Sequence, residues 1–173
     1  YTRLCALLAS IALPFAAAQP KPVTAERIIA ADSEPQNWLA HGRTYGEQRY
    51  SPLKQVNDGN VEKLGLAWSY ATNSTRGLQA TPIVVDGRMY ATGVWSVVYA
   101  LDAKTGKELW TYDPQVPREW GRYACCDAVN RGVALWGDAL YFATLDGRLI
   151  SLDARTGKQR FFFNDTATTE IYT

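Results

Sequence analysis

The sequence predicts an all-β fold, a fragment of a β-propeller built from four-stranded antiparallel blades. Residues 100–110, ALDAKTGKELW, reappear at 151–161 as SLDARTGKQRF, which is a displacement of 51 residues. A repeat period near 50 residues is typical of propellers and solenoids. Between residues 80 and 160, short apolar runs alternate with turn residues and no stretch has helical periodicity. Four short antiparallel strands per repeat form a propeller blade, whereas a β-sandwich would not repeat one sequence string.

The first complete repeat contains four runs with the character of strands. They are ATPIVV (80–85), RMYA (88–91), VVYAL (97–101) and ELWTY (108–112). The pair Asp86-Gly87 separates the first two runs, and Asp-Gly between β-rich runs is a strong hairpin signal. Gly106 and Gly157 occupy the same place in the two TGK turns, where a residue with positive φ is expected.

Two tryptophans stand at the ends of predicted outer strands. Trp110 closes the first complete repeat, and we expect it to pack between adjacent blades and to bury on the order of 200 Å². Trp68, in KLGLAWSY, is expected to end the outer strand of an earlier blade. Because two repeats cannot close a propeller, which needs at least four blades, we expect the chain to be part of a longer protein.

The N-terminal residues 1–18 are predicted to be a secretory signal peptide whose start is missing. Arg3 precedes an apolar run over residues 4–15, and three alanines at 16–18 form a site of the A-x-A type. The run is shorter than the ~20 residues that a membrane span needs, and a buried N-terminal helix is the alternative. Export to the periplasm, an oxidising compartment in which disulfides persist, is therefore expected.

The C-terminal residues 161–173 are predicted to be a non-native tail. Three consecutive phenylalanines are what a run of T bases encodes, and the following NDTATTEIYT matches the translation of a sequencing-adapter oligonucleotide. Residues of a non-native tail, like those of a fusion scar, are not expected to contribute to the native fold. Residues 19–160 remain as the predicted N-terminal blades.

Composition excludes several classes of function. The formal net charge is +1 without a basic block, which gives nucleic-acid binding no electrostatic support. A single histidine, His41, and the lack of a CxxC pattern argue against a zinc or haem site within this chain. No membrane span is expected.

Cys125 and Cys126 are adjacent in the string ACCDAVNRG, and Cys5, the only other cysteine, lies in the predicted leader. Neighbouring Cα atoms are about 3.8 Å apart, below the roughly 4.4–6.8 Å that a disulfide prefers. A bridge between these cysteines would be a strained ring that closes no loop. It could instead offer a flat, rigid surface for packing, and the alternative is an inert pair of buried thiols.

Four segments in the same order resemble the pyrroloquinoline quinone (PQQ) dependent alcohol dehydrogenases. They are GRTYGEQRYSPLKQVNDGNVEKLGLAWSY, RGLQATPIVVDG, YACCDAVNRGVALW and TLDGRLISLDARTGK. The resemblance covers about residues 38–160, and ALDAKTGKELW looks like the family's tryptophan docking motif. It implies an eight-bladed propeller with one PQQ in the central channel, beside a calcium ion or, in some members, a lanthanide.

The resemblance also implies roles for five residues. Cys125 and Cys126 would form a disulfide ring that stacks on one face of PQQ. Arg131 matches an arginine that contacts the cofactor in this family. The alternative interpretation is that Arg131 is a solvated surface residue. Val129 matches a position whose backbone approaches the cofactor, although its side chain could be core. Gln79 matches a position that is commonly Glu and bonds the cofactor, although a polar residue facing solvent would also fit.

The implied activity is oxidation of a small, primary or similar, alcohol with PQQ as hydride acceptor. Electrons would leave to a cytochrome c-type acceptor or to haem c in a missing C-terminal region. The family's catalytic base and metal ligands lie in later blades, so no catalytic residue and no metal ligand is expected in this chain. A non-catalytic periplasmic propeller scaffold and a PQQ sugar dehydrogenase are the alternatives.

The remaining polar residues near the cysteines receive structural roles. Asp127 and Asn130 are expected to hold the loop by local hydrogen bonds. No chemistry is assigned to Trp95, Arg122 or Asp146.

Overall fold

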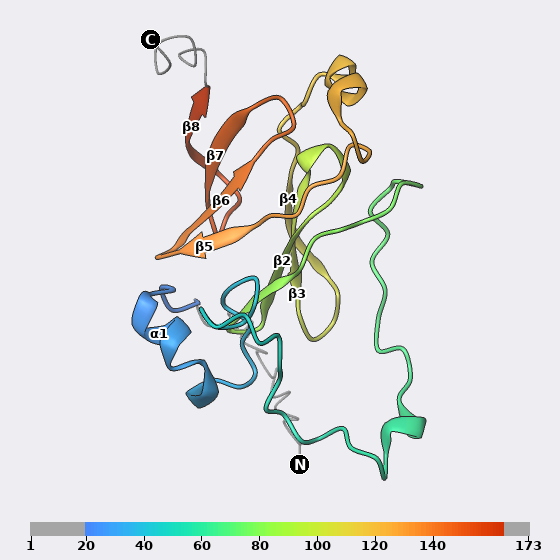
Figure 1. Ribbon diagram of the computed structural model, residues 1–173, viewed down its shortest axis with the longest axis vertical. Coiled ribbons are helices and arrows are strands. Elements are labelled where there is room, and N and C mark those ends of the chain that lie inside the picture. The colour runs from blue at the N-terminus through green and yellow to red at the C-terminus, as the bar shows by residue number, and fades with distance from the viewer. Residues whose placement is uncertain (1–19, 165–173) are drawn as a thin grey trace, which may run out of the picture.

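Two four-stranded antiparallel sheets lie side by side in the computed structural model, which describes residues 20–164 (Figure 1). The predicted leader and residues 165–173 of the predicted tail lie outside the described residues. The prediction of an all-β fold with four-stranded antiparallel sheets is confirmed. No helix in the described part of the chain is long and apolar enough to cross a membrane.

The strands follow one another in each sheet in the order of the sequence. The first sheet consists of β1 (Ile83–Val85), β2 (Arg88–Thr92), β3 (Val98–Asp102) and β4 (Glu108–Tyr112). The second sheet consists of β5 (Ala134–Trp136), β6 (Ala139–Ala143), β7 (Arg148–Asp153) and β8 (Gln159–Asn164). In the first sheet, each strand except β3 begins 51 residues before the corresponding strand of the second sheet. The sequence repeat is therefore a structural repeat.

Short helices lie outside the sheets. They are α1 (Ala25–Ile29) and four 3-10 helices, η1 (Ala31–Ser33), η2 (Val61–Lys63), η3 (Val94–Ser96) and η4 (Arg118–Tyr123). The chain around η2 runs away from both sheets and then returns along the first sheet toward β1 (Figure 1).

The turn between the last two strands is the same in both sheets. Asp102 Oδ1 accepts hydrogen bonds from the backbone N and hydroxyl of Thr105, each at 2.8 Å. Asp153 Oδ1 accepts the corresponding two bonds from Thr156, also at 2.8 Å. Both following glycines have a φ of 70°, which L-residues with a Cβ rarely adopt. The TGK turns therefore have the conformation that their glycines predict.

The main core lies between the two sheets. Alternate side chains of β6 and β7 point toward the first sheet, and Leu140, Ile150 and Leu152 are fully buried there. From the first sheet, the hydroxyl of Tyr90 donates to the carbonyl of Ala154 at 3.0 Å. Buried apolar surface and satisfied polar groups together fix the second sheet against the first.

Two tryptophans, which are 42 residues apart in the sequence, make equivalent contacts with the two sheets. The indole Nε1 of Trp110 donates to Ala154 O at 3.1 Å, and a Cβ at Gly157 would lie 2.7 Å from its ring. The indole of Trp68 donates to the carbonyl of Ala103 at 3.2 Å and its ring lies over Gly106. Each ring thus covers the TGK turn of the sheet that follows it along the chain.

The N-terminal segment is attached to both sheets. Isolated bridges join Val23 to Gly137 in the second sheet and Trp38 to Val84 in the first. Arg27 forms ion pairs with Glu34 and with Asp86 in the β1–β2 turn.

Candidate functional site

The two cysteines lie on the loop that joins the sheets, between η4 and β5. Both side chains are exposed, their Sγ atoms are 2.8 Å apart, and the structure holds both as free thiols. The hydrogen bond with Cys125 and the charge of that neighbour raise the pKa of Cys126, while the positive charge of Arg131 opposes this rise.

Arg131 and Gln79 meet, although they are 52 positions apart in the sequence. The Nη2 group of Arg131 donates a hydrogen bond to Oε1 of Gln79. Gln79 precedes β1 and Arg131 precedes β5, so the two residues come from equivalent ends of adjacent sheets. Both are exposed, and the guanidinium keeps four of its five N–H donors for other partners.

Val129 and Arg131 line one cavity of about 520 Å³. Tyr141 and Leu149 contribute apolar surface to it from β6 and β7, on the side of the second sheet that faces away from the first. The structure thus places Arg131 at the end of the second sheet where β6 ends and β7 begins, beside its outer face.

The loop itself is held by hydrogen bonds, as predicted for Asp127 and Asn130. The amide Nδ2 of Asn130 donates to Ser96 Oγ at 2.9 Å and to Ala143 O at 2.7 Å. Its Oδ1 accepts from Gly132 N at 2.8 Å. Asp127 Oδ1 accepts from the backbone N of Ala128 at 2.7 Å.

Sequence reasoning missed two residues that support the loop. Trp95 has a φ of 59°, and its backbone N donates to Ala128 O at 2.8 Å. Its ring is covered by the guanidinium of Arg118, whose Cζ lies 4.4 Å from the ring centroid. Arg76 forms an ion pair with Asp127. Nothing in the local sequence marks either residue, because both contacts depend on how distant segments meet.

Arg122 and Asp146, which received no chemical role, make only local contacts among the described residues. Arg122 lies over the ring of Tyr123, with 4.8 Å from its Cζ to the ring centroid. Asp146 accepts hydrogen bonds from Thr144 and Arg148.

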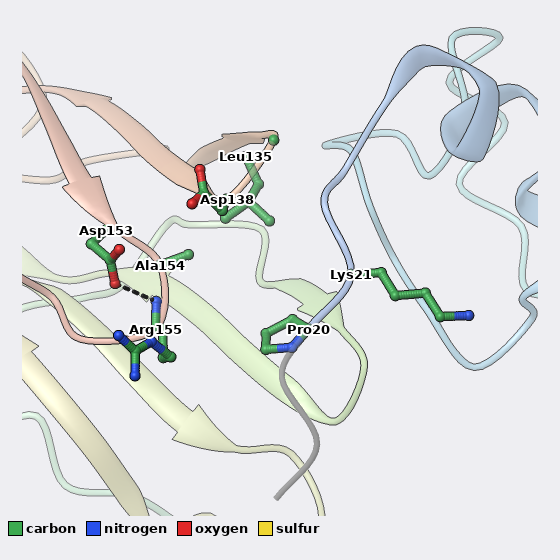
Figure 2. A pocket seen from close by; sticks show the side chains of 8 residues that line it. Pro20, Lys21, Leu135, Asp138, Asp153, Ala154 and Arg155 are labelled. Atoms are coloured by element: carbon green, nitrogen blue, oxygen red, sulfur yellow. Dashed lines mark hydrogen bonds between the residues drawn. The ribbon is translucent and has the colours of Figure 1, made fainter.

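A second cavity, of about 190 Å³, lies at the opposite end of the second sheet (Figure 2). It is lined by Pro20, Lys21, Leu135, Gly137, Asp138, Asp153, Ala154 and Arg155. Figure 2 shows the bond from the backbone N of Arg155 to Asp153 that shapes the turn there. None of the predicted site residues lies in this cavity. Within residues 20–164, no three His, Cys, Asp or Glu side chains gather closely enough to hold a metal ion.

Comparison with known proteins decides the family. The profile of the PQQ family described as "Glucose/ethanol/alcohol dehydrogenase, beta-propeller domain" matches residues 38–173. The chain belongs to this family. Quinohemoprotein alcohol dehydrogenase ADH-IIG of Pseudomonas putida is 61% identical over 147 residues, which are 85% of this chain and 20% of that protein. The 1-butanol dehydrogenase (cytochrome c) of Thauera butanivorans is 58% identical over 122 residues, 70% of this chain and 18% of that protein.

Solved structures of two dehydrogenases resemble the chain as well. The structure of ADHIIG from Pseudomonas putida HK5 matches with a TM-score of 0.82 and 59% identity, over 86% of this chain and 22% of that one. A europium-containing methanol dehydrogenase matches with a TM-score of 0.74 and 39% identity, over 80% of this chain and 24% of that one. The chain spans about a fifth of the length of the curated relatives it matches.

Proposed function

We propose that the chain is the N-terminal part of a quinoprotein dehydrogenase that oxidises a primary or similar alcohol with PQQ as hydride acceptor. Its contribution is one wall of the PQQ pocket. The observation that carries this proposal is the meeting of Arg131 with Gln79, on the loop that also carries the cysteine pair, next to a cavity that Arg131 and Val129 line. The names of the relatives, which describe quinohemoprotein and cytochrome c-linked alcohol dehydrogenases, support the same reading.

The residues present fit PQQ in charge. PQQ is a flat ring system with three carboxylates, and an exposed guanidinium offers a planar fork to a carboxylate. Gln79 carries no charge, so it leaves the positive charge of Arg131 unneutralised for an anionic ligand. When bound, PQQ supplies an electrophilic carbonyl that accepts hydride from the alcohol.

The cysteine pair is proposed to be oxidised in the exported protein. Two thiols 2.8 Å apart lose two electrons and two protons to a disulfide of a thiol-oxidising protein, and one S–S bond forms between Cys125 and Cys126. The resulting ring closes no loop, so its contribution is a rigid surface on which PQQ stacks. The signal peptide at residues 1–18 and a periplasmic location belong to the same proposal.

Further blades are proposed to follow the second sheet and to close an eight-bladed propeller with tryptophan docking motifs. Leu149 is 42% exposed on the outer side of this sheet, whereas its counterpart Val98 in the first sheet is fully buried by the second sheet. The metal, calcium or a lanthanide, and the catalytic base would then be held by residues that follow this chain. Electrons would pass to a cytochrome c-type acceptor or to haem c in the same protein.

Alcohol-dependent dye reduction by the full-length protein tests the proposal. We expect activity only when PQQ and calcium or a lanthanide are added, and Arg131→Ala should raise the Kd for PQQ at least tenfold, about 1.4 kcal/mol. Arg155→Ala removes another exposed arginine, at the opposite end of the sheet, and serves as the matched control. Absence of activity with the cofactor and metal present would contradict the proposal.

A further inference from the structure

The two ends of the cysteine loop are attached to the molecule unequally. At the C-terminal end, Asn130 bonds Ser96 and Ala143 on neighbouring hairpins. The other end of the loop comprises residues 125–127. Within the described part of the chain, Arg76 is the only side chain outside the loop that forms a hydrogen bond with these residues. The part of the loop that carries the cysteines is thus held from outside by one side-chain contact, with Arg76, and by the backbone bond from Trp95 N to Ala128 O at 2.8 Å beside it.

The hydrogen bond from Arg76 is made to Asp127, the residue that directly follows the two cysteines. Asp127 has a φ of 73°, a left-handed conformation, and forms an isolated bridge with Cys125. Its Oδ1 accepts from Ala128 N at 2.7 Å and also from Nη1 of Arg76. One carboxylate oxygen therefore joins a local turn, which orients the cysteines, to a distant cation.

Arg76 and Gln79 belong to the same short segment before β1, and each contacts the cysteine loop. Arg76 donates to Asp127, and Gln79 accepts from Arg131. The two contacts lie on either side of Val129, so they fix the loop at two points along its length. Because the side chains of Arg76 and Asp127 are 51% and 37% exposed, their ion pair contributes little to global stability, and its consequence is local.

We infer that Arg76 is a positioning residue: through its ion pair with Asp127 it holds the Cys125–Cys126 pair in the place where a cofactor packs. The inference rests on the proposed function, since the cofactor is PQQ, but the order of the loop is a property of the protein without PQQ. Arg76 itself touches no reacting atom.

Binding of PQQ to the full-length protein gives the first test, measured by quenching of tryptophan fluorescence. Arg76→Ala and Asp127→Asn should each raise the Kd about tenfold, equivalent to ~1.4 kcal/mol, while Arg76→Lys should restore most of the affinity. The double variant should be no weaker than either single variant, because both remove one interaction. At saturating PQQ, kcat and the KM for alcohol should stay near wild type. Arg155→Ala is the control for loss of an exposed positive charge.

Hydrogen exchange in the PQQ-free protein gives the second test. Arg76→Ala should speed exchange in a peptide covering residues 123–128 and leave a peptide covering β6 unchanged. A failure of wild-type protein to bind PQQ would refute the proposed function and leave this measurement decisive for Arg76. Unchanged exchange at 123–128, equal acceleration in both peptides, or additive losses of PQQ affinity in the double variant would each overturn the inference.

Discussion

The two sheets have the same internal construction and different surroundings. Their turns repeat bond for bond at Asp102 and Asp153. Yet the second sheet covers one side of the first, while its own outer side carries exposed Leu149 and Phe161. The first sheet is covered on its other side as well, where Tyr99 donates to the carbonyl of Thr72 at 3.1 Å. The repeat thus determines the conformation of a sheet, and its neighbours determine which side chains become core.

The largest expected difference concerns leucines on the two sides of the second sheet. Leu140→Ala should lower the free energy of unfolding of the 173-residue chain by about 3 kcal/mol, because Leu140 is fully buried between the sheets. Leu149→Ala should cost less than ~1 kcal/mol, because that side chain is 42% exposed. Urea denaturation measures both.

The same pair tests the proposal of further blades. In a longer chain that includes the next repeat, the cost of Leu149→Ala should approach that of Leu140→Ala. Equal costs in the 173-residue chain would contradict the difference between the two sides.

A smaller difference is expected between two turn glycines of the second sheet. Gly157 and Gly137 have φ values of 70° and 62°, so alanine at either site has a backbone cost of about 1 kcal/mol. A Cβ at Gly157 would also lie 2.7 Å from the ring of Trp110, whereas nothing lies within 4 Å at Gly137. Gly157→Ala should therefore destabilise by ~1–3 kcal/mol more than Gly137→Ala, measured by thermal unfolding. Equal losses of stability in the two variants would show that the ring of Trp110 moves aside without a loss of stability.

The smallest expected effect is electrostatic. A hydrogen bond from Arg160, together with those from Thr156, lowers the pKa of Asp153 to about 2 from an ordinary value of 3.8. The corresponding Thr105 lowers the pKa of Asp102 as well, but Asp102 has Leu109 at the position that corresponds to Arg160. A lowered carboxyl pKa contributes stability above the unfolded value, and this contribution is lost as the pH falls from about 4 toward 2. Arg160→Leu should raise the pKa of Asp153 in a carbon-13 NMR titration and move acid unfolding to higher pH. Arg155→Leu is the control, and an unchanged Asp153 titration in Arg160→Leu would contradict the assignment.

The sequence was sufficient to predict the strands and turns of the two sheets and part of the candidate site. The hairpin at Asp86-Gly87 and the TGK turns were predictable, because positive φ restricts the choice of residue at those positions. The local bonds of Asp127 and Asn130 were predictable for a similar reason, since short polar side chains bond their own backbone. The contact of Arg131 with Gln79 was not predictable from spacing, although both were named, because it requires two sheets to lie side by side.

By itself, the sequence determined that the chain forms two repeated sheets with defined turns, because backbone preferences and apolar alternation act over a few residues. The tertiary structure alone decided that Trp95 and Arg76 support the cysteine loop. These features depend on which distant segments pack together, and burial and charge pairing between such segments leave no local trace in the order of residues.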